Sequence, residues 1–182
     1  MSLKKEISQI IYSINGDVIF DNTDSLNSKI FYYPSGSVRS VTMMKDEKEN
    51  GQEIAYYDLT GEVVVTMNWV EGLRNGQRIE YYKSGNIMNT IDYINNLQQG
   101  EQKNYYESGE FSSTVNIVDD LRQGQEIGYY ESGEVLYKVN YVDDLTQGEN
   151  IGYYESGEVK FTRNWVDDLK QGEYKSYYES GA

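Results

Sequence analysis

The sequence contains no cysteine and no histidine, and these two absences exclude several kinds of chemistry. Without cysteine the chain forms no disulfide, offers no thiolate nucleophile and lacks the ligands of most zinc sites. Without histidine it also lacks the most common general base and metal ligand. Any catalysis would have to depend on carboxylates or tyrosines alone.

Large apolar residues are scarce, and tyrosine compensates for them. Phenylalanine occurs 4 times and proline once, whereas tyrosine occurs 19 times in 182 residues. The apolar segment "ISQIIYSI" near the start is interrupted by Ser and Gln, and no uncharged run approaches the roughly 18 residues of a transmembrane helix. The sequence therefore predicts neither a signal peptide nor a membrane span, which favours the cytoplasm without identifying the compartment.

Positive charge is also in deficit, with 16 Lys and Arg against 30 Asp and Glu and a formal net charge of −14. Such a surface repels phosphate backbones and anionic headgroups, so we expect no binding to nucleic acid or to acidic membranes. The charge favours a cationic partner, either a basic protein or a metal ion, and the partner that we expect is a protein.

The chain repeats one unit of about 24 residues. Paired tyrosines mark the unit, and each pair follows the previous one by 24 or 25 residues, at 32/33, 56/57, 81/82, 105/106, 129/130, 153/154 and 177/178. Glycine precedes most pairs by five residues and follows each pair closely, and Leu73, Leu97, Leu121, Leu145 and Leu169 keep the same step. Agreement over this many columns is a strong sign of a repeat architecture.

Each unit has the pattern of a β-hairpin. Two runs rich in Tyr, Val, Ile and Thr are separated by Ser-Gly on one side and by a polar "DDLTQG"-type loop on the other. In "YYPSGS", Pro34 suits the second position of a type I turn and Gly36 the left-handed position that closes a three-residue loop. We therefore predict an all-β protein, an elongated single-layer antiparallel meander of β-hairpin repeats over residues 27–182.

This turn geometry predicts which side chains share a face. It places Tyr130 opposite Glu134 and Tyr129 opposite Val135. One predicted face then carries Ile127, Tyr129, Val135, Tyr137, Val139 and Tyr141, and the other carries Tyr130, Leu136, Lys138 and Asn140. The next unit is predicted to repeat this arrangement.

Both ends depart from the repeat. Residues 1–26 hold one irregular half-unit around "YSINGDVIF", which we expect to be an N-terminal cap. At the other end, "GEYKSYYE" supplies a first strand without its return strand, so we expect an open edge strand suited to self-association or to covering by a partner.

The repeat resembles the bacterial variant of the MORN repeat (membrane occupation and recognition nexus). The resemblance rests on the tyrosine pair, two variable residues, a glycine, an apolar strand with an aromatic residue, and a second glycine, registered over residues 27–182. The copy at 56–61 has one extra turn residue, and positions 27 and 48 lack the expected Gly and Leu. The resemblance implies a repeat sheet used for binding or scaffolding. Bacterial relatives of this type are often labelled antitoxins of toxin–antitoxin pairs, while eukaryotic relatives are linked to membranes and scaffolds.

A second resemblance is to cell-wall and choline-binding repeats, which also show adjacent tyrosines followed by glycine. Those repeats hold cationic ligands in aromatic cages and usually carry Trp beside the tyrosines, where this chain has none. It implies the alternative function, a cell-surface carbohydrate or choline-type binder.

The two tyrosine columns predict different roles. The first tyrosines of the pairs, such as Tyr105 and Tyr129, are expected in the core. The second tyrosines would form a ladder of rings about 10 Å apart on the more polar face, and they are our predicted partner-binding residues: Tyr82, Tyr106, Tyr130 and Tyr154. Ring packing against neighbouring strands and lysine stems is the alternative explanation of this ladder.

Acidic residues recur in the turns, and each group has a structural and a chemical interpretation. The pairs such as Asp143/Asp144 suit turns, because Asp bonds nearby backbone N–H groups, and calcium binding is the weaker alternative. Glu107, Glu131 and Glu155 occupy equivalent positions, whereas an acid and base pair needs unlike environments. We therefore predict no catalytic residue, metal or cofactor, and a non-catalytic protein-binding or scaffold module.

Overall fold

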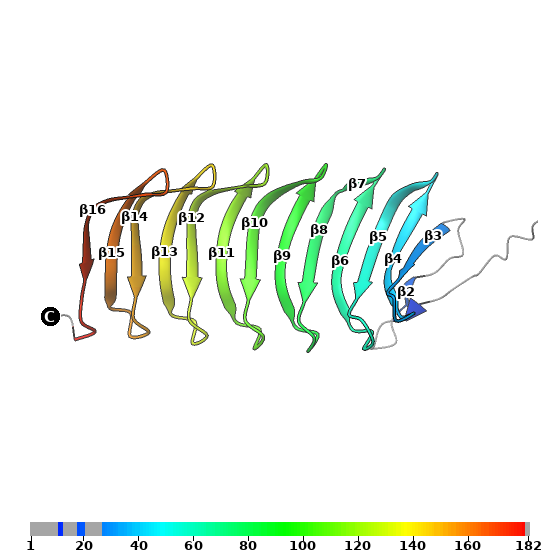
Figure 1. Cartoon of the computed structure of the whole chain (residues 1–182), viewed down its shortest axis with the longest axis horizontal. Coiled ribbons are helices and arrows are strands. Elements are labelled where there is room, and N and C mark those ends of the chain that lie inside the picture. The colour runs from blue at the N-terminus through cyan, green and yellow to red at the C-terminus, as the bar shows by residue number, and fades with distance from the viewer. Residues whose placement is uncertain (1–10, 13–17, 21–26, 181–182) are drawn as a thin grey trace, which may run out of the picture.

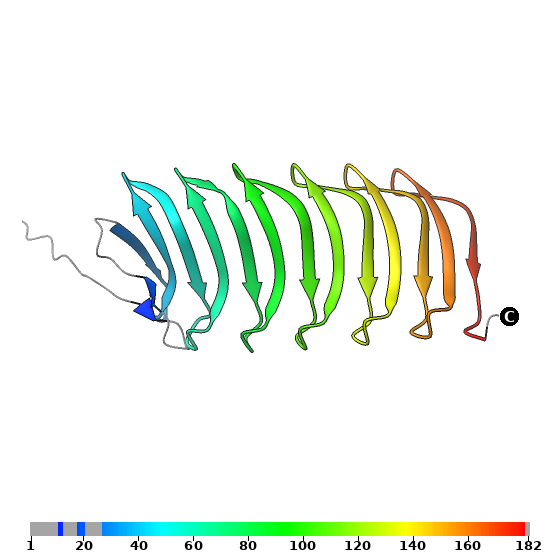
Figure 2. The same cartoon turned by 180° about the vertical axis from the view of Figure 1, so that it is seen from behind.

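A computed structural model describes residues 11–12, 18–20 and 27–180, and all of their regular structure is β-strand. β1 (Ile11–Tyr12) pairs with β2 (Val18–Phe20), and the other fourteen strands form one antiparallel sheet (Figures 1 and 2). These are β3 (Asn27–Tyr32), β4 (Val38–Lys45), β5 (Lys48–Tyr56), β6 (Val63–Val70), β7 (Leu73–Arg74), β8 (Gly76–Tyr81), β9 (Ile87–Ile94), β10 (Leu97–Tyr105), β11 (Phe111–Val118), β12 (Leu121–Tyr129), β13 (Val135–Val142), β14 (Leu145–Tyr153), β15 (Val159–Val166) and β16 (Leu169–Ser176). Strands adjacent in the chain lie side by side in this sheet, except that β7 and β8 both pair with β6. The predicted all-β meander is confirmed, while the expected cap at 1–26 lies mostly outside the described residues.

The tyrosine turns have the predicted geometry. Tyr130 N–H donates to Glu134 O at 2.8 Å, Gly133 N–H donates to Tyr130 O at 2.9 Å, and Gly133 has φ 91°. This is a three-residue loop closed by a glycine in the left-handed region. In the copy with the extra residue, Tyr57 N–H instead reaches Glu62 O, so the loop is one residue longer there.

The connections at the other ends of the strands, away from the tyrosine turns, are shorter than predicted. Asp143 and Asp144 have φ 49° and 67°, and the strands run up to them on both sides, with Val142 paired to Leu145. Both central residues of a two-residue type I′ turn need positive φ, a conformation that Asn and Asp tolerate better than most residues. The expected polar loop is therefore a two-residue turn followed directly by a strand.

A β-bulge after each tyrosine turn changes which residues share a face. Tyr129 is paired with Val135, but Gly128 is paired with Tyr137, so Leu136 is an extra residue on β13. Because side chains alternate along a strand, one extra residue moves the remainder of β13 to the other face. The predicted grouping of Tyr137, Val139 and Tyr141 with Tyr129 was therefore wrong.

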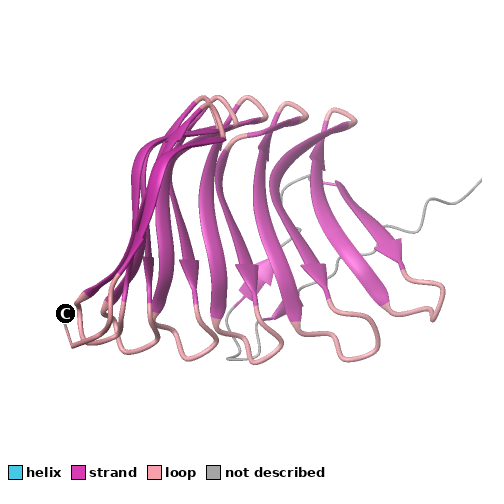
Figure 3. Ribbon diagram, turned by 60° about the vertical axis from the view of Figure 1, so that its left-hand side comes forward, coloured by secondary structure: helices cyan, strands magenta, loops and turns pink. Residues whose placement is uncertain are grey.

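The best-buried cluster lies on the face opposite the first tyrosines. We call it the core face, and its buried side chains are Met67, Ile91, Tyr93, Val115 and Ile117, with Trp69 and Tyr141 packed against them. The other face is called the tyrosine face, because it carries Tyr81, Tyr105, Tyr129 and Tyr153. These four are only half-buried, so the prediction that they form the core was wrong. Figure 3 shows the strands curving along their length between two rows of turns.

Candidate functional site

The second tyrosines form the predicted ladder along the row of tyrosine turns, and the structure gives their hydroxyls an internal partner. Each hydroxyl donates to the backbone carbonyl of the first tyrosine in the next unit. The contacts are Tyr33 to Tyr56 at 2.8 Å, Tyr57 to Tyr81 at 3.0 Å, Tyr82 to Tyr105 at 2.7 Å, Tyr106 to Tyr129 at 2.6 Å, Tyr130 to Tyr153 at 2.8 Å and Tyr154 to Tyr177 at 2.9 Å. The hydroxyls therefore link successive units, and a binding role of the rings stays a prediction.

The turns at Asp119–Asp120, Asp143–Asp144 and Asp167–Asp168, which we call the aspartate turns, link the units at the other ends of the strands. Asp144 N–H donates to Arg122 O at 3.1 Å, and Asp144 Oδ1 accepts from Arg122 N at 3.0 Å and from its Nε at 2.8 Å. Asp120 makes the same pair of hydrogen bonds with the backbone of Gln98, and Asp168 with the backbone of Thr146. We call these paired contacts the aspartate clasps. The side chains thus bond the preceding unit rather than their own turn.

The first aspartates of these turns also have partners within the chain. Asp119, Asp143 and Asp167 each accept from the side chain of a glutamine in the preceding unit. Among the described residues, no three acidic side chains gather in a way that would hold a metal ion. The aspartates of these turns therefore join neighbouring units, which the expectation of bonds within the turn did not include.

An exposed aliphatic stripe flanks the two-residue turns, three of which contain aspartate pairs, on the tyrosine face. In five units a Val or Ile before the turn pairs across it with a Leu after the turn, as Val142 pairs with Leu145. All ten side chains are at least 38% exposed: Val70, Leu73, Ile94, Leu97, Val118, Leu121, Val142, Leu145, Val166 and Leu169. We call these ten residues the aliphatic stripe. A row of polar side chains, including Asn116 and Gln147, borders it within the sheet.

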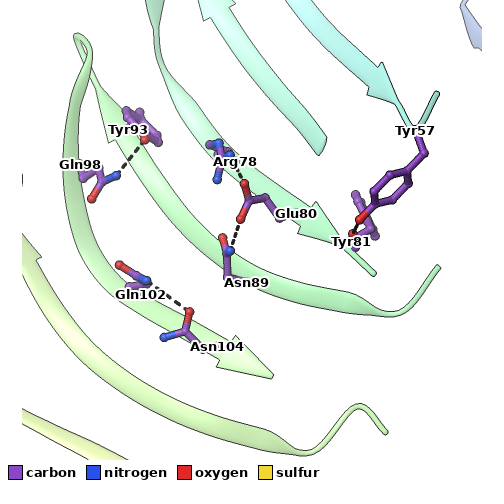
Figure 4. Close-up of polar contacts among 9 residues, drawn as sticks. All are labelled: Tyr57, Arg78, Glu80, Tyr81, Asn89, Tyr93, Gln98, Gln102 and Asn104. Atoms are coloured by element: carbon purple, nitrogen blue, oxygen red, sulfur yellow. Dashed lines mark hydrogen bonds and ion pairs between the residues drawn. The ribbon is translucent and has the colours of Figure 1, made fainter. Parts of the chain in front are cut away.

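The middle of the core face is polar between its buried apolar residues (Figure 4). Glu80 accepts from both Arg78 and Asn89, and Gln102 donates to Asn104, which in turn donates to Ser113 Oγ at 2.9 Å. Partial burial opposes ionisation of Glu80. The hydrogen bonds from Arg78 and Asn89 and the charge of Arg78 outweigh this, so the pKa of Glu80 lies below its usual value.

Toward β16 the core face becomes aromatic. Tyr137 and Phe161 lie across Gly128 and Gly152 on the neighbouring strands, and a Cβ added to either glycine would overlap ring carbons. In the preceding units, Asn104 and Glu80 occupy the positions of these glycines. The middle units thus carry a pair of polar side chains at this place, whereas the last units carry an aromatic ring packed over a glycine.

These rings line a hollow of about 780 Å³ over β12 to β16. The Tyr137 hydroxyl donates to Glu126 Oε1 at 2.6 Å, and burial with this carboxylate strongly raises the pKa of Tyr137. Burial likewise raises the pKa of Tyr141, whose ring lies 3.9 Å from the Arg122 guanidinium. Both phenols are therefore neutral at physiological pH, the Tyr137 hydroxyl acts as a donor, and both rings provide apolar surface.

One polar group in the hollow lacks a partner. Asn150 is 8% exposed and lies on β14 directly opposite Arg163, and its Oδ1 is buried without a hydrogen bond among the described residues. Sequence analysis missed both this residue and the aliphatic stripe. The recurring "VDDL" was a visible signal for the stripe, and Gly128 and Gly152 were the signal for the rings.

Four segments of the chain are similar to a known repeat family. Residues 74–95, 98–116, 122–143 and 170–182 match the family model of the MORN repeat variant. The match agrees with the resemblance seen in the sequence, and repeats of this family commonly mediate binding or scaffolding.

Other comparisons add little. Among curated proteins no match was found. Among solved structures, a crystal structure of a GtfA/B complex bound to UDP and GlcNAc aligns with 86% of this chain at 11% identity and a TM-score of 0.24. The chain spans only 27% of the length of that protein. No helix long and apolar enough to cross a membrane occurs among the described residues.

Proposed function

We propose that this chain of MORN-variant repeats is a non-catalytic protein-binding module that docks a basic, amphipathic partner segment on the aliphatic stripe. The observation that carries the proposal is the exposure of ten large aliphatic side chains in register over five units. Single exposed apolar residues are ordinary on a protein surface, but a contiguous apolar patch rimmed by polar groups marks an interaction site.

The charge beside the stripe selects the kind of partner. The aspartate turns place carboxylates next to the last three Val and Leu pairs of the stripe, about 10 Å apart from unit to unit, and Glu71 lies at the first turn. Hydrogen bonds from Arg122 and from Thr146 lower the pKa of Asp144 and of Asp168, so both remain ionised at neutral pH. Lysines and arginines beside an apolar row would complement this pattern, whereas an acidic segment would be repelled.

Two finer aspects belong to the same proposal. A bacterial antitoxin that masks a basic toxin is one partner relation that fits an acidic binding surface, and the family resemblance suggests it. The rings of Tyr82, Tyr106, Tyr130 and Tyr154 supply a second contact surface at the other row of turns. Glu107, Glu131 and Glu155 are equivalent turn residues, which is consistent with a module that binds without catalysis.

The direct test is titration of two labelled amphipathic helical peptides of the same leucine pattern, one with lysines and one with glutamates on the polar face. We expect the basic peptide to bind, more weakly as salt is added, and the acidic peptide not to bind. The double variant Leu121→Ser with Leu145→Ser should weaken binding at least tenfold.

The matched control changes two apolar residues at the other end of the strands, Ile87→Ser with Phe111→Ser, which are exposed to a similar extent. This variant should bind the basic peptide as the unchanged protein does. Equal affinity for the two peptides, or unchanged affinity after the stripe substitutions, would contradict the proposal. Comparing Tyr130→Leu with Tyr130→Phe shows whether the ring of the ladder also contributes.

A further inference from the structure

The hollow on the core face lies on the opposite side of the sheet from the aliphatic stripe, so the two surfaces could be occupied independently. Its floor consists of aromatic rings that lie along the sheet. The Tyr137 ring crosses Gly128 to bring its hydroxyl to Glu126, and the Phe161 ring crosses Gly152. Because one ring face covers the glycine, the other is directed into the hollow, which both rings line.

The spacing of the rings suits an extended ligand. Tyr137 and Phe161 belong to strands two apart and pair with Gly152 from either side, so they repeat at about 10 Å along the sheet. Tyr174 on β16 extends the row, with its centroid 5.9 Å from that of Phe161 and the ring planes 30° apart. A ligand that covers this row must present flat apolar faces at regular intervals.

Asn150 supplies the second, independent indication of a ligand. A buried amide oxygen without a hydrogen bond destabilises the protein relative to a paired one. Asn150 lines the hollow and its Oδ1 is buried, so a ligand donor reaches this oxygen only when neighbouring side chains move aside. A hydroxyl at the edge of a stacked ligand ring would then pair the amide.

The geometry points to a β-linked glycan as the ligand, with its pyranose rings stacked on Tyr137 and Phe161 and a hydroxyl paired with Asn150. A pyranose ring combines an apolar C–H face with hydroxyls around its edge, and alternate rings of an extended β-linked chain present equivalent faces. Glu126 and Arg163 at the hollow offer an acceptor and a donor for further hydroxyls. An acidic protein surface disfavours the polyanionic alternatives, such as nucleic acid.

The two tryptophans of the chain allow a site-specific test, because Trp165 lines the hollow and Trp69 does not. Cellohexaose, mannohexaose and xylohexaose are titrated against the full chain, with α-linked maltohexaose as the control. We expect at least one β-linked probe to change tryptophan emission saturably. The change should persist in Trp69→Phe and disappear in Trp165→Phe.

Two variants separate recognition from stability. Asn150→Leu removes the unpaired amide at nearly constant volume, so it should raise the Tm and yet weaken binding. Phe161→Leu keeps Gly152 covered but removes the stacking face, and should weaken binding roughly five- to tenfold.

Three results would overturn the inference. The first is the absence of any emission change with all three β-linked probes, including the case in which an extended peptide changes the emission of Trp165 instead. The second is equal binding of maltohexaose. The third is unchanged glycan affinity in both Asn150→Leu and Phe161→Leu. None of these variants changes a residue of the aliphatic stripe, so peptide binding to the stripe is measured independently of glycan binding to the hollow.

Discussion

The contact between Phe161 and Gly152 gives a sharp quantitative test of the core face. Gly152 has an ordinary strand backbone, so alanine is conformationally acceptable there, but its Cβ would lie well within 3.0 Å of the Phe161 ring. Overpacking of this kind costs about 1–3 kcal/mol, and we expect Gly152→Ala to destabilise the protein by about 2 kcal/mol. In a Phe161→Ala background the ring is gone, and the same change should stabilise by about 0.5–1 kcal/mol because glycine is unfavourable in a strand.

The assay is a double-mutant cycle by urea denaturation, monitored by far-UV circular dichroism. The two residues should show a coupling of about 2.5–3 kcal/mol, the difference between the two effects of Gly152→Ala. Gly133→Ala serves as the control, because Gly133 has φ 91° and nothing near its added Cβ. It should be destabilising through backbone strain alone, by the same amount in both backgrounds. Additive free energies for Gly152→Ala and Phe161→Ala would refute the packing described here.

Two further predictions concern the links between units. Tyr130→Phe removes the hydroxyl that donates to Tyr153 O and should lower the free energy of unfolding by about 1 kcal/mol. Tyr178→Phe, on a side chain that is 77% exposed, should leave the free energy of unfolding unchanged. Denaturant titration of both variants measures this difference, and equal stabilities would contradict the linking role of the Tyr130 hydroxyl. Because the pKa of Asp144 and of Asp168 is lower in the folded chain, their contribution is present above the unfolded value of about 3.9 and is lost as the pH falls below it. Thermal melts should thus show a Tm that falls between about pH 5 and pH 2. The fall should be less steep in Asp144→Asn, because asparagine keeps the hydrogen-bond acceptor without the charge, as Asn96 does toward Arg74 N. An identical dependence of Tm on pH in the variant would contradict the role of the Asp144 carboxylate.

The repeat period made the architecture predictable. Seven registered tyrosine pairs and their glycines establish hairpins, and Pro34 with Gly36 establishes the three-residue turn that the hydrogen bonds confirm. Consecutive hairpins with short connections have few alternatives to a meander. The order of the strands in the sheet therefore followed from local signals alone.

The distribution of side chains between the faces was not predictable in the same way. Alternation is counted from the turn, so a single bulged residue reverses every later assignment, and Leu136 has nothing in its type that marks it as an extra residue. Arg163 was the visible warning, because it stands one unit after Val139, in a column that the predicted grouping makes apolar. The hydrogen-bond partner of each tyrosine hydroxyl also could not be predicted, because it is a backbone carbonyl 23 or 24 residues away in the sequence.

The sites that hold the units together and the sites that differ between them occupy different parts of each strand. The tyrosine hydroxyls and the aspartate clasps lie at the two ends of the strands, where their contacts recur from unit to unit. The pair in the middle of the core face changes from Glu80 with Asn89 to Gly152 with Phe161 while the strand pairing stays the same. Substitutions in the middle of the strands therefore leave the links intact, and a repeat that is uniform at its ends can acquire a local binding surface in a few of its units.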